Sequence, residues 1–252
     1  MKSATIVQSD RRFDEICEAL VETLKTRFET VEVVASLTTD DPLITYIMIE
    51  FWGVVPKRYI AYDVGQGLTD RQQRDSERVW SLFRAEGTVY VPFRYSECLD
   101  YYRVDDLQDI DVLFYGTLSE RRVNTLGRIR KMGMTVKVLH ETYGLERDSV
   151  VCRAKIVLNL HRETPARLEV GRLVPLLSNG VFVVSETDLD WQTNQEWKDY
   201  VVFGDLDVIP EICRTWVARP VSRSMFAKRA YEKFKTVSMS SQFPWSQAFP
   251  VA

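Results

Sequence analysis

The chain has 252 residues, of which 45% are apolar and 27% charged, and its formal net charge is −3. This is the composition of an ordinary globular protein with room for one large domain or two small ones. The charge gives no bulk signal for nucleic acid binding, although a local basic face is still compatible with it.

The first residues, "MKSATIVQSDRRFDEI", carry charges where a secretory signal peptide needs an apolar run. No apolar stretch reaches the roughly 20 residues that a membrane-spanning helix needs. The four cysteines lie far apart and form no CxxC pair, which argues against a zinc site or a disulfide framework. These features predict a cytoplasmic protein with reduced thiols.

The first hundred residues alternate between predicted helices and strands. Apolar residues between Phe13 and Phe28 recur at the spacing of one helical face. Three strand candidates follow, "TVEVVASL", "LITYIMIEF" and "RYIAYDV", which are rich in β-branched and aromatic residues. We expect a helix over Thr69–Arg84 with Val79, Trp80 and Phe83 facing inward, and a short strand in "GTVYVPF". This order is typical of an α/β layer.

A regular strand–helix series begins after residue 105. Its strands are "IDVLFYG", "TVKVL", "KIVLNLH" and "VFVVSE", and its helices are Glu120–Met132, "RDSVVCRA" and Leu168–Ser178. Strands that alternate with helices of this length predict a parallel sheet, and their continuous apolar runs indicate that both faces are covered. Two closing helices follow, in "DLDVIPEICRTWVARP" and "SRSMFAKRAYEKFKTV". We expect the remaining tail to pack irregularly on the surface.

The turn after the strand "IDVLFYG" has features of an anion site. In an open parallel sheet, ligands collect at the carboxyl ends of the strands, and Gly116 lies at such an end. The next helix begins near Ser119, so its free N–H groups point to the same place. Arg121 and Arg122 add guanidinium groups that suit phosphate oxygens. The alternative is a common turn with solvated arginines, because one glycine is weaker than a G-x-G-x-x-G motif.

Further polar residues follow the neighbouring strands. Asn159 and His161 end the strand "KIVLNLH", and Glu169 and Arg172 share one face near the start of the next helix. A carboxylate in this place suits ribose hydroxyls, and Arg172 suits a diphosphate. A structural histidine and a surface ion pair are the alternatives. The role of Glu186, at the end of the last strand, stays open.

The segment "HETYGLERD" follows the second strand of this series. It brings Tyr143 and Gly144 to the same edge of the sheet. Tyr143 is suited to stacking on a nucleotide base, and an aromatic that only packs is an equal alternative.

The stretches "DIDVLFYGTLSERR", "YGLERDSVVCRAKIVLNLH" and "LEVGRLVPLLSNGVFVVSE" together resemble the nucleotide-sugar half of GT-B glycosyltransferases. The nearest group is the group-1-like transferases related to CgeB-type spore-maturation proteins. The likeness is strong from about Asp109 to Glu186 and weaker from about Pro56 to Phe234. It implies an α/β protein with two Rossmann-like domains that face each other across a cleft, of which the first is reduced. Residues 1–105 would be the acceptor domain, 106–215 the nucleotide-sugar domain, and 216–252 a closing helix and tail.

The resemblance also implies roles for individual residues. It places the diphosphate by Gly116, Arg121, Arg122 and Arg172, the base by Tyr143 and Gly144, the ribose by Glu169, and the sugar or phosphate by Asn159 and the catalytic candidate His161. An inverting enzyme also needs a base near the acceptor, and Asp63 is the candidate, with a loop carboxylate as the alternative. Pro175 stands where many relatives carry an acid, which leaves the stereochemical outcome open.

The implied reaction is metal-independent transfer from a nucleotide sugar, with a UDP-sugar favoured and no cofactor. The acceptor is a glycan or another hydroxyl compound. A hydroxymethylated DNA base also fits, because small viral GT-B enzymes modify such bases and the stretch Arg219–Lys235 is basic. Two rival hypotheses are a nucleotide-binding or regulatory module without catalysis and a Rossmann-type dehydrogenase. The missing G-x-G-x-x-G argues against the dehydrogenase.

Overall fold

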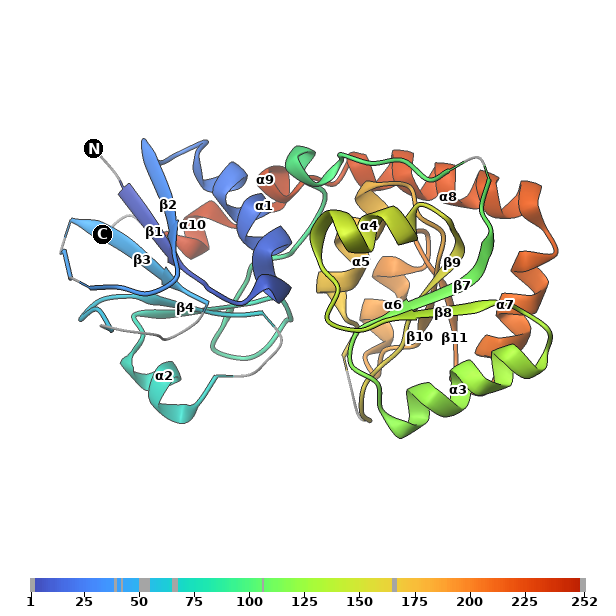
Figure 1. The fold of residues 1–252 in the computed structure, drawn as a ribbon. Coiled ribbons are helices and arrows are strands. Elements are labelled where there is room, and N and C mark those ends of the chain that lie inside the picture. The colour runs from blue at the N-terminus through green and yellow to red at the C-terminus, as the bar shows by residue number, and fades with distance from the viewer. Residues whose placement is uncertain are drawn as a thin grey trace. The chain divides into compact units, whose positions relative to one another are not determined.

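The computed structural model describes residues 3–38, 40–41, 43–49, 55–64, 68–105, 107–164 and 167–249. The chain forms two compact units (Figure 1). The first comprises Met1–Leu99 and Val237–Ala252, and the second comprises Asp100–Thr236. Each is a Rossmann-like α/β domain built on its own parallel sheet, as the sequence predicts.

The sheet of the first unit has the strand order β2-β1-β3-β4-β5-β6, and its neighbouring strands are parallel. The strands are β1 (Ser3–Val7), β2 (Thr30–Val34), β3 (Ile44–Met48), β4 (Ile60–Asp63), β5 (Arg78–Ser81) and β6 (Val89–Tyr90). Its main helix is α1 (Asp14–Leu24), which begins and ends inside the predicted helical segment. Shorter helical turns are η1 (Arg11–Phe13), α2 (Asp70–Asp75), η2 (Glu97–Leu99), α9 (Met239–Gln242) and α10 (Trp245–Ala248).

The helix predicted over Thr69–Arg84 is wrong in its second half. A capping box at Thr69 starts α2, which ends at Asp75, and β5 begins at Arg78. β5 runs between β4 and β6 and buries Trp80 completely. Pairing with two neighbouring strands therefore overrides the helical spacing of the apolar residues.

The end of the chain packs into the core of the first unit. The ring centroid of Trp80 lies 5.5 Å from that of Phe243 and 5.3 Å from that of Phe249, both edge-on. Met239 is buried, and its N–H donates to the carbonyl of Tyr95 at 2.8 Å. The tail is therefore not an irregular surface segment, because its aromatic residues cover one strand of the sheet.

The sheet of the second unit has the order β11-β10-β9-β7-β8, with parallel neighbours. The strands are β7 (Ile110–Tyr115), β8 (Val136–Leu139), β9 (Ala154–Asn159), β10 (Val183–Glu186) and β11 (Val202–Gly204). β10 is buried at every residue and β9 at all but one, as expected of central strands with helices on both faces.

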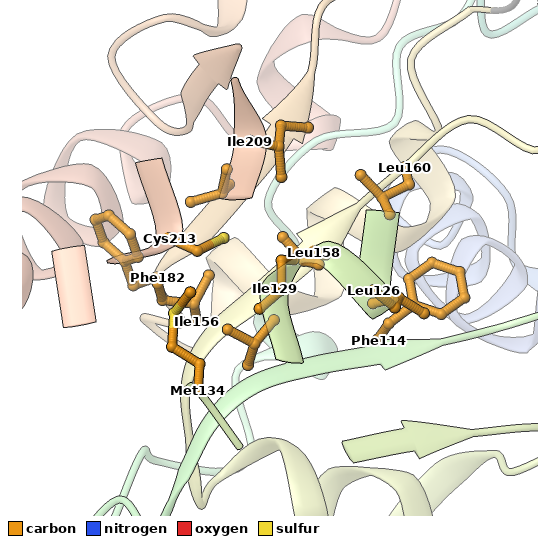
Figure 2. Close-up of a cluster of buried hydrophobic side chains, with 12 residues drawn as sticks. Phe114, Leu126, Ile129, Met134, Ile156, Leu158, Leu160, Phe182, Ile209 and Cys213 are labelled. Carbon is orange, nitrogen blue, oxygen red and sulfur yellow. The ribbon is translucent and has the colours of Figure 1, made fainter. Parts of the chain in front are cut away.

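Six helices of the second unit are described: α3 (Glu120–Lys131), α4 (Gly144–Val151), α5 (Val170–Ser178), α6 (Trp191–Trp197), α7 (Ile209–Val217) and α8 (Pro220–Lys235). Apolar residues of α3 and α7 pack with those of β7 and β9 in a buried cluster (Figure 2). It includes Phe114, Leu126, Ile129, Ile156, Leu158, Phe182, Ile209 and Cys213. This core fixes the strands whose ends carry the candidate site.

The chain passes into the second unit after Leu99, earlier than the expected boundary at residue 105, and returns to the first unit after Thr236. Segment 216–252 is therefore divided between the units, because α8 buries Ala230 and Phe234 in the second unit and the tail packs in the first. All four cysteines are free thiols. Among the described residues, no helix has both the length and the apolar character needed to cross a membrane.

Candidate functional site at the carboxyl edge of the second sheet

The strands of the second unit deliver the predicted residues to one edge. Ser185 of β10 pairs in register with Asn159 of β9, and Leu113 of β7 pairs with Val157 of β9. The carboxyl ends of β7, β9 and β10 therefore lie side by side. We call the residues at these ends and on the helices that follow the rim: Gly116, Arg121, Arg122, Asn159, His161, Glu169, Arg172 and Glu186.

Three helices begin at this edge without a side-chain cap. They are α3, α4 and α5, and none of their N-cap residues, Ser119, Tyr143 and Glu169, makes a capping hydrogen bond from its side chain. The following helix α6 differs, because Asp190 caps it. The first N–H groups of a helix lack intrahelical partners and lie at its positive end. Three such ends at one edge favour an anion.

Gly116 allows the turn from β7 to come close to α5. Its φ of +124° is a conformation that residues with a side chain rarely adopt. A Cβ atom at this position would lie 3.0 Å from Nη2 of Arg172. The backbone conformation therefore favours glycine here, and a side chain would also force the guanidinium of Arg172 to shift.

Arg172 lies at the start of α5 with a side chain that is only 9% exposed. Its Nη1 donates to Oδ1 of Asn159 at 2.8 Å and lies 2.6 Å from Oε2 of Glu169. The guanidinium stacks on Phe114 and Tyr115, with centroid distances of 5.4 and 5.3 Å. Its Nε is buried and has no hydrogen-bond partner within the described part of the chain. Arg172 is thus fixed in place and keeps unused donor capacity.

Asn159 orients Arg172 through a hydrogen bond. It is fully buried, and its Nδ2 donates to Oγ of Ser185 at 3.1 Å. Because the other end of its amide accepts from Arg172, both ends are used. Asn159 therefore acts on the rim by orienting the guanidinium.

Arg122 is not the solvated arginine of the alternative interpretation. Its side chain is 3% exposed, its Nη1 donates to the carbonyl of Thr117 at 2.7 Å, and its Nε donates to that of Leu160 at 3.1 Å. Its Nη2 also binds Oε1 of Glu169. Burial lowers the pKa of Arg122 to about 10, although Glu169 partly opposes this effect. The residue remains charged at neutral pH and braces the turn after β7.

Arg121 and Glu186 form a second ion pair on the rim. Nη1 of Arg121 lies 2.8 Å from Oε2 of Glu186 and 2.6 Å from the carbonyl oxygen of His161. Glu186 is 8% exposed, and its hydrogen bond raises the pKa of Arg121. The sequence left the role of Glu186 open, and the structure assigns it to holding Arg121.

His161 is buried between these groups. Its backbone N–H donates to Oε2 of Glu186 at 3.0 Å, and its Nε2 lies 3.0 Å from the carbonyl oxygen of Thr187. A carbonyl only accepts, so Nε2 carries a proton, and in the neutral imidazole Nδ1 then keeps a lone pair. Nδ1 has no partner among the residues that the structure describes. Nδ1 of the neutral imidazole is thus an oriented acceptor that no described residue uses.

The remaining predicted residues lie in two places. Tyr143 is the N-cap residue of α4, and Gly144 follows with a φ of +56°. Both are at the carboxyl edge of the second sheet, next to the end of β8. Asp63 belongs to the first unit, at the carboxyl end of β4. The structure thus gathers all the predicted residues except Asp63 at one edge of one domain.

One buried group beneath the edge was not predicted. Arg147 of α4 donates from Nε to Oδ1 of Asp148 at 2.8 Å and lies 5.4 Å from the ring centroid of Tyr115. Asp148 also accepts from the hydroxyl of Tyr101 at 2.6 Å. The only sequence signal is an Arg-Asp pair in a short helix, which does not distinguish it from a solvated pair. The group supports the ring on which Arg172 stacks.

The rim as a whole favours an anionic ligand. Three guanidinium groups face two carboxylates there, so one positive charge is uncompensated within this cluster. The uncapped helix ends add partial positive charge. The chemistry that fits is binding and stabilisation of a phosphate or diphosphate, because planar guanidinium donors match phosphate oxygens.

Searches with the sequence found no matching protein family and no matching curated protein. Solved structures do match. The chain aligns over 99% of its length with all of HepE from Anabaena, solved with UDP and glucose, at a TM-score of 0.61 and 11% identity. It aligns over 98% of its length with 98% of WaaG, a glycosyltransferase involved in lipopolysaccharide biosynthesis, at 0.53 and 10%.

The fold is that of the GT-B glycosyltransferases. TarM also matches, with a TM-score of 0.58 and 8% identity over 84% of this chain. The chain spans only 56% of TarM, a little more than half of that protein. At such identities the likeness concerns the fold, and the GT-B fold hosts donors and acceptors of many kinds.

Proposed function

We propose that this GT-B protein transfers a sugar from a nucleoside-diphosphate sugar to a hydroxyl acceptor. The observation that carries the proposal is the buried guanidinium of Arg172. It is held by Asn159 against Gly116, at the uncapped start of α5. Phosphate groups bind at such helix ends. HepE, which shares the fold, was solved with UDP and with UDP-glucose.

We assign the diphosphate to Arg172, to the backbone at Gly116 and to the first N–H groups of α3 and α5. Arg121 and Arg122 contribute their charge from positions fixed by Glu186 and by backbone carbonyls. In glycosyl transfer, the bond from the anomeric carbon to the diphosphate oxygen breaks and negative charge grows on that oxygen. Preorganised donors stabilise developing charge by about 3 kcal/mol each in comparable sites.

The nucleoside is assigned to the end of β8 and the start of α5. Tyr143 stacks on the base, Gly144 lets the backbone approach it, and Glu169 accepts hydrogen bonds from the ribose hydroxyls. We favour a UDP-sugar, since two of the solved HepE structures contain UDP and UDP-glucose. The motifs around these residues also favour the CgeB-type group within the fold.

His161 and Asp63 are the candidates for proton handling. In the neutral tautomer, Nδ1 of His161 accepts a hydrogen bond from a donor-sugar hydroxyl or from a protonated phosphate oxygen. Asp63, in the first unit, would take the proton of the acceptor hydroxyl if the reaction inverts the anomeric centre. The diphosphate is held by guanidinium and N–H groups in this scheme, so we propose that transfer needs no metal.

We propose a glycan acceptor over a DNA base. The basic face of α8 is partly neutralised, because Lys233 lies 2.5 Å from Asp199 and Lys235 lies 3.5 Å from Asp100. Arg223 is buried and donates to the carbonyl of Trp216 at 2.7 Å. Part of the positive charge of this helix is thus already paired or buried, whereas binding to DNA depends strongly on free cations.

The test is turnover with a panel of UDP-, GDP-, TDP- and CMP-sugars and mixed glycan and DNA acceptors. Arg172→Ala should reduce turnover by at least about a hundredfold with the fold intact. Arg122→Ala should abolish turnover. The matched control is Arg214→Ala, because Arg214 is an exposed arginine of the same domain that pairs with Glu211. Near-normal turnover in Arg172→Ala would refute the assignment. Nucleotide binding without turnover in any mixture would instead indicate a non-catalytic module.

A further inference from the structure

We infer that Glu169 is a built-in occupant of the anion site and that it sets which anions can enter. The carboxylate lies where the diphosphate is assigned, and only an anion that outcompetes it binds. The inference rests on the proposed function for the natural ligand, but the competition itself concerns any phosphate compound.

The contacts show a carboxylate held as a phosphate would be. One oxygen of Glu169 binds Nη2 of Arg122, and the other lies 2.6 Å from Nη1 of Arg172. Two guanidinium groups on different helices, α3 and α5, thus converge on the two oxygens of a single anion. Arginine forks bind phosphate oxygens in the same manner.

The exposure of the three side chains shows that Glu169, and not an arginine, can leave the ion pairs. The side chains of Arg122 and Arg172 are 3% and 9% exposed, whereas that of Glu169 is 31% exposed. Arg122 is tied to two backbone carbonyls, and Arg172 is tied to Asn159. The arginines therefore form a fixed receptor, and the carboxylate is the exchangeable part on its outer side.

Exchange favours anions of high charge. A singly charged anion offers the arginines no more attraction than the carboxylate does, and the carboxylate is tethered, so its effective concentration is in the millimolar range or above. A diphosphate brings several charges and more oxygens to the same guanidinium groups. Glu169 therefore excludes common small anions and admits diphosphates. Once displaced, it is free to accept the ribose hydroxyls of the same ligand.

The experiment measures binding of inorganic pyrophosphate and inorganic phosphate to the full chain by calorimetry. Neither probe has a ribose, so the competition is seen alone. Glu169→Gln should bind pyrophosphate about tenfold more tightly than the native chain, equivalent to about 1.4 kcal/mol for the two lost ion pairs. At a pH where phosphate is singly charged, it should not bind the native chain detectably but should bind this variant. The control Glu211→Gln removes the same charge from an exposed pair on α7 and should change neither affinity.

Unchanged or weaker pyrophosphate binding in Glu169→Gln, or an equal gain in Glu211→Gln, would overturn the inference. Should Glu169→Gln fail to fold, Glu169→Asp keeps the charge but is too short to reach both arginines. It should show a smaller gain, and no gain would count against the inference. If Glu169→Gln tightens pyrophosphate while native protein binds no nucleotide, the proposed donor falls and the inference stands.

Discussion

Replacing Gly116 with alanine tests how the rim is built. The φ of +124° makes a side chain at this position cost about 1–3 kcal/mol of folding free energy. The new Cβ would also lie 3.0 Å from Nη2 of Arg172, so the guanidinium must shift by a few tenths of an ångström. Charge-assisted hydrogen bonds contribute about 1.5–3 kcal/mol, so misaligning one should weaken UDP binding by roughly tenfold to a hundredfold.

The matched control is Gly133→Ala, because Gly133 also has a positive φ, +86°, but has no atom within 4 Å of the new Cβ. Both variants should lose about 1–3 kcal/mol in urea unfolding followed by circular dichroism. Only Gly116→Ala should lose UDP affinity in calorimetry. If both variants bind UDP as tightly as the native chain, Arg172 does not hold the nucleotide through this close approach.

Four further predictions follow from particular contacts. Phe243→Ala should destabilise the first unit by about 3–5 kcal/mol in urea unfolding, because Phe243 is a buried ring against Trp80. Burial raises the pKa of Asp111, but hydrogen bonds from Lys155 and Thr135 outweigh it and lower the pKa below its ordinary 3.8. Asp111 therefore stabilises the fold above pH ~4 and loses this contribution as the pH falls further, so Asp111→Asn should flatten the acid limb of stability against pH. In Glu169→Gln, the affinity gain for UDP should be smaller than that for pyrophosphate, because a neutral amide oxygen accepts the ribose hydroxyls more weakly than a carboxylate does; equal gains would contradict the ribose role of Glu169. Turnover should persist in EDTA within about twofold, and a complete loss would show a metal requirement.

The regular part of the second unit follows closely from the sequence. Its strands are unbroken apolar runs, and the helices between them have apolar residues at the spacing of one helical face. Both patterns can be recognised in the sequence without knowledge of the fold. Several shorter elements could not be predicted from the sequence. β1 has five residues and is central only because β2 and β3 flank it, and α6 is a polar segment whose main signal is its cap, Asp190. β5 was predicted as helix because its pairing partners are not visible in the local sequence.

The candidate site, like the fold, could be predicted from the sequence only in part. The sequence indicates which residues reach the rim, because strand ends of a parallel sheet lie together. It does not indicate how they pair. Arg121 and Glu186 are 65 positions apart, and Arg122 and Glu169 are 47 apart. Such pairs depend on the distances between helix starts, which only the folded sheet sets. For the same reason, the sequence left solvated arginines open as an alternative, whereas the structure buries Arg122 and half-buries Arg121.

The tail that returns to the first unit affects how the chain folds during synthesis. Phe243 and Phe249, which cover Trp80, are synthesised only after the whole of the second unit. The second unit is therefore the first to have all its residues outside the ribosome. Until Phe243 and Phe249 emerge, Trp80 of β5 in the amino-terminal sheet lacks these two ring contacts. The usual amino-to-carboxyl order of domain maturation is thereby reversed, and a nascent chain stalled before residue 237 should bind chaperones through its oldest part.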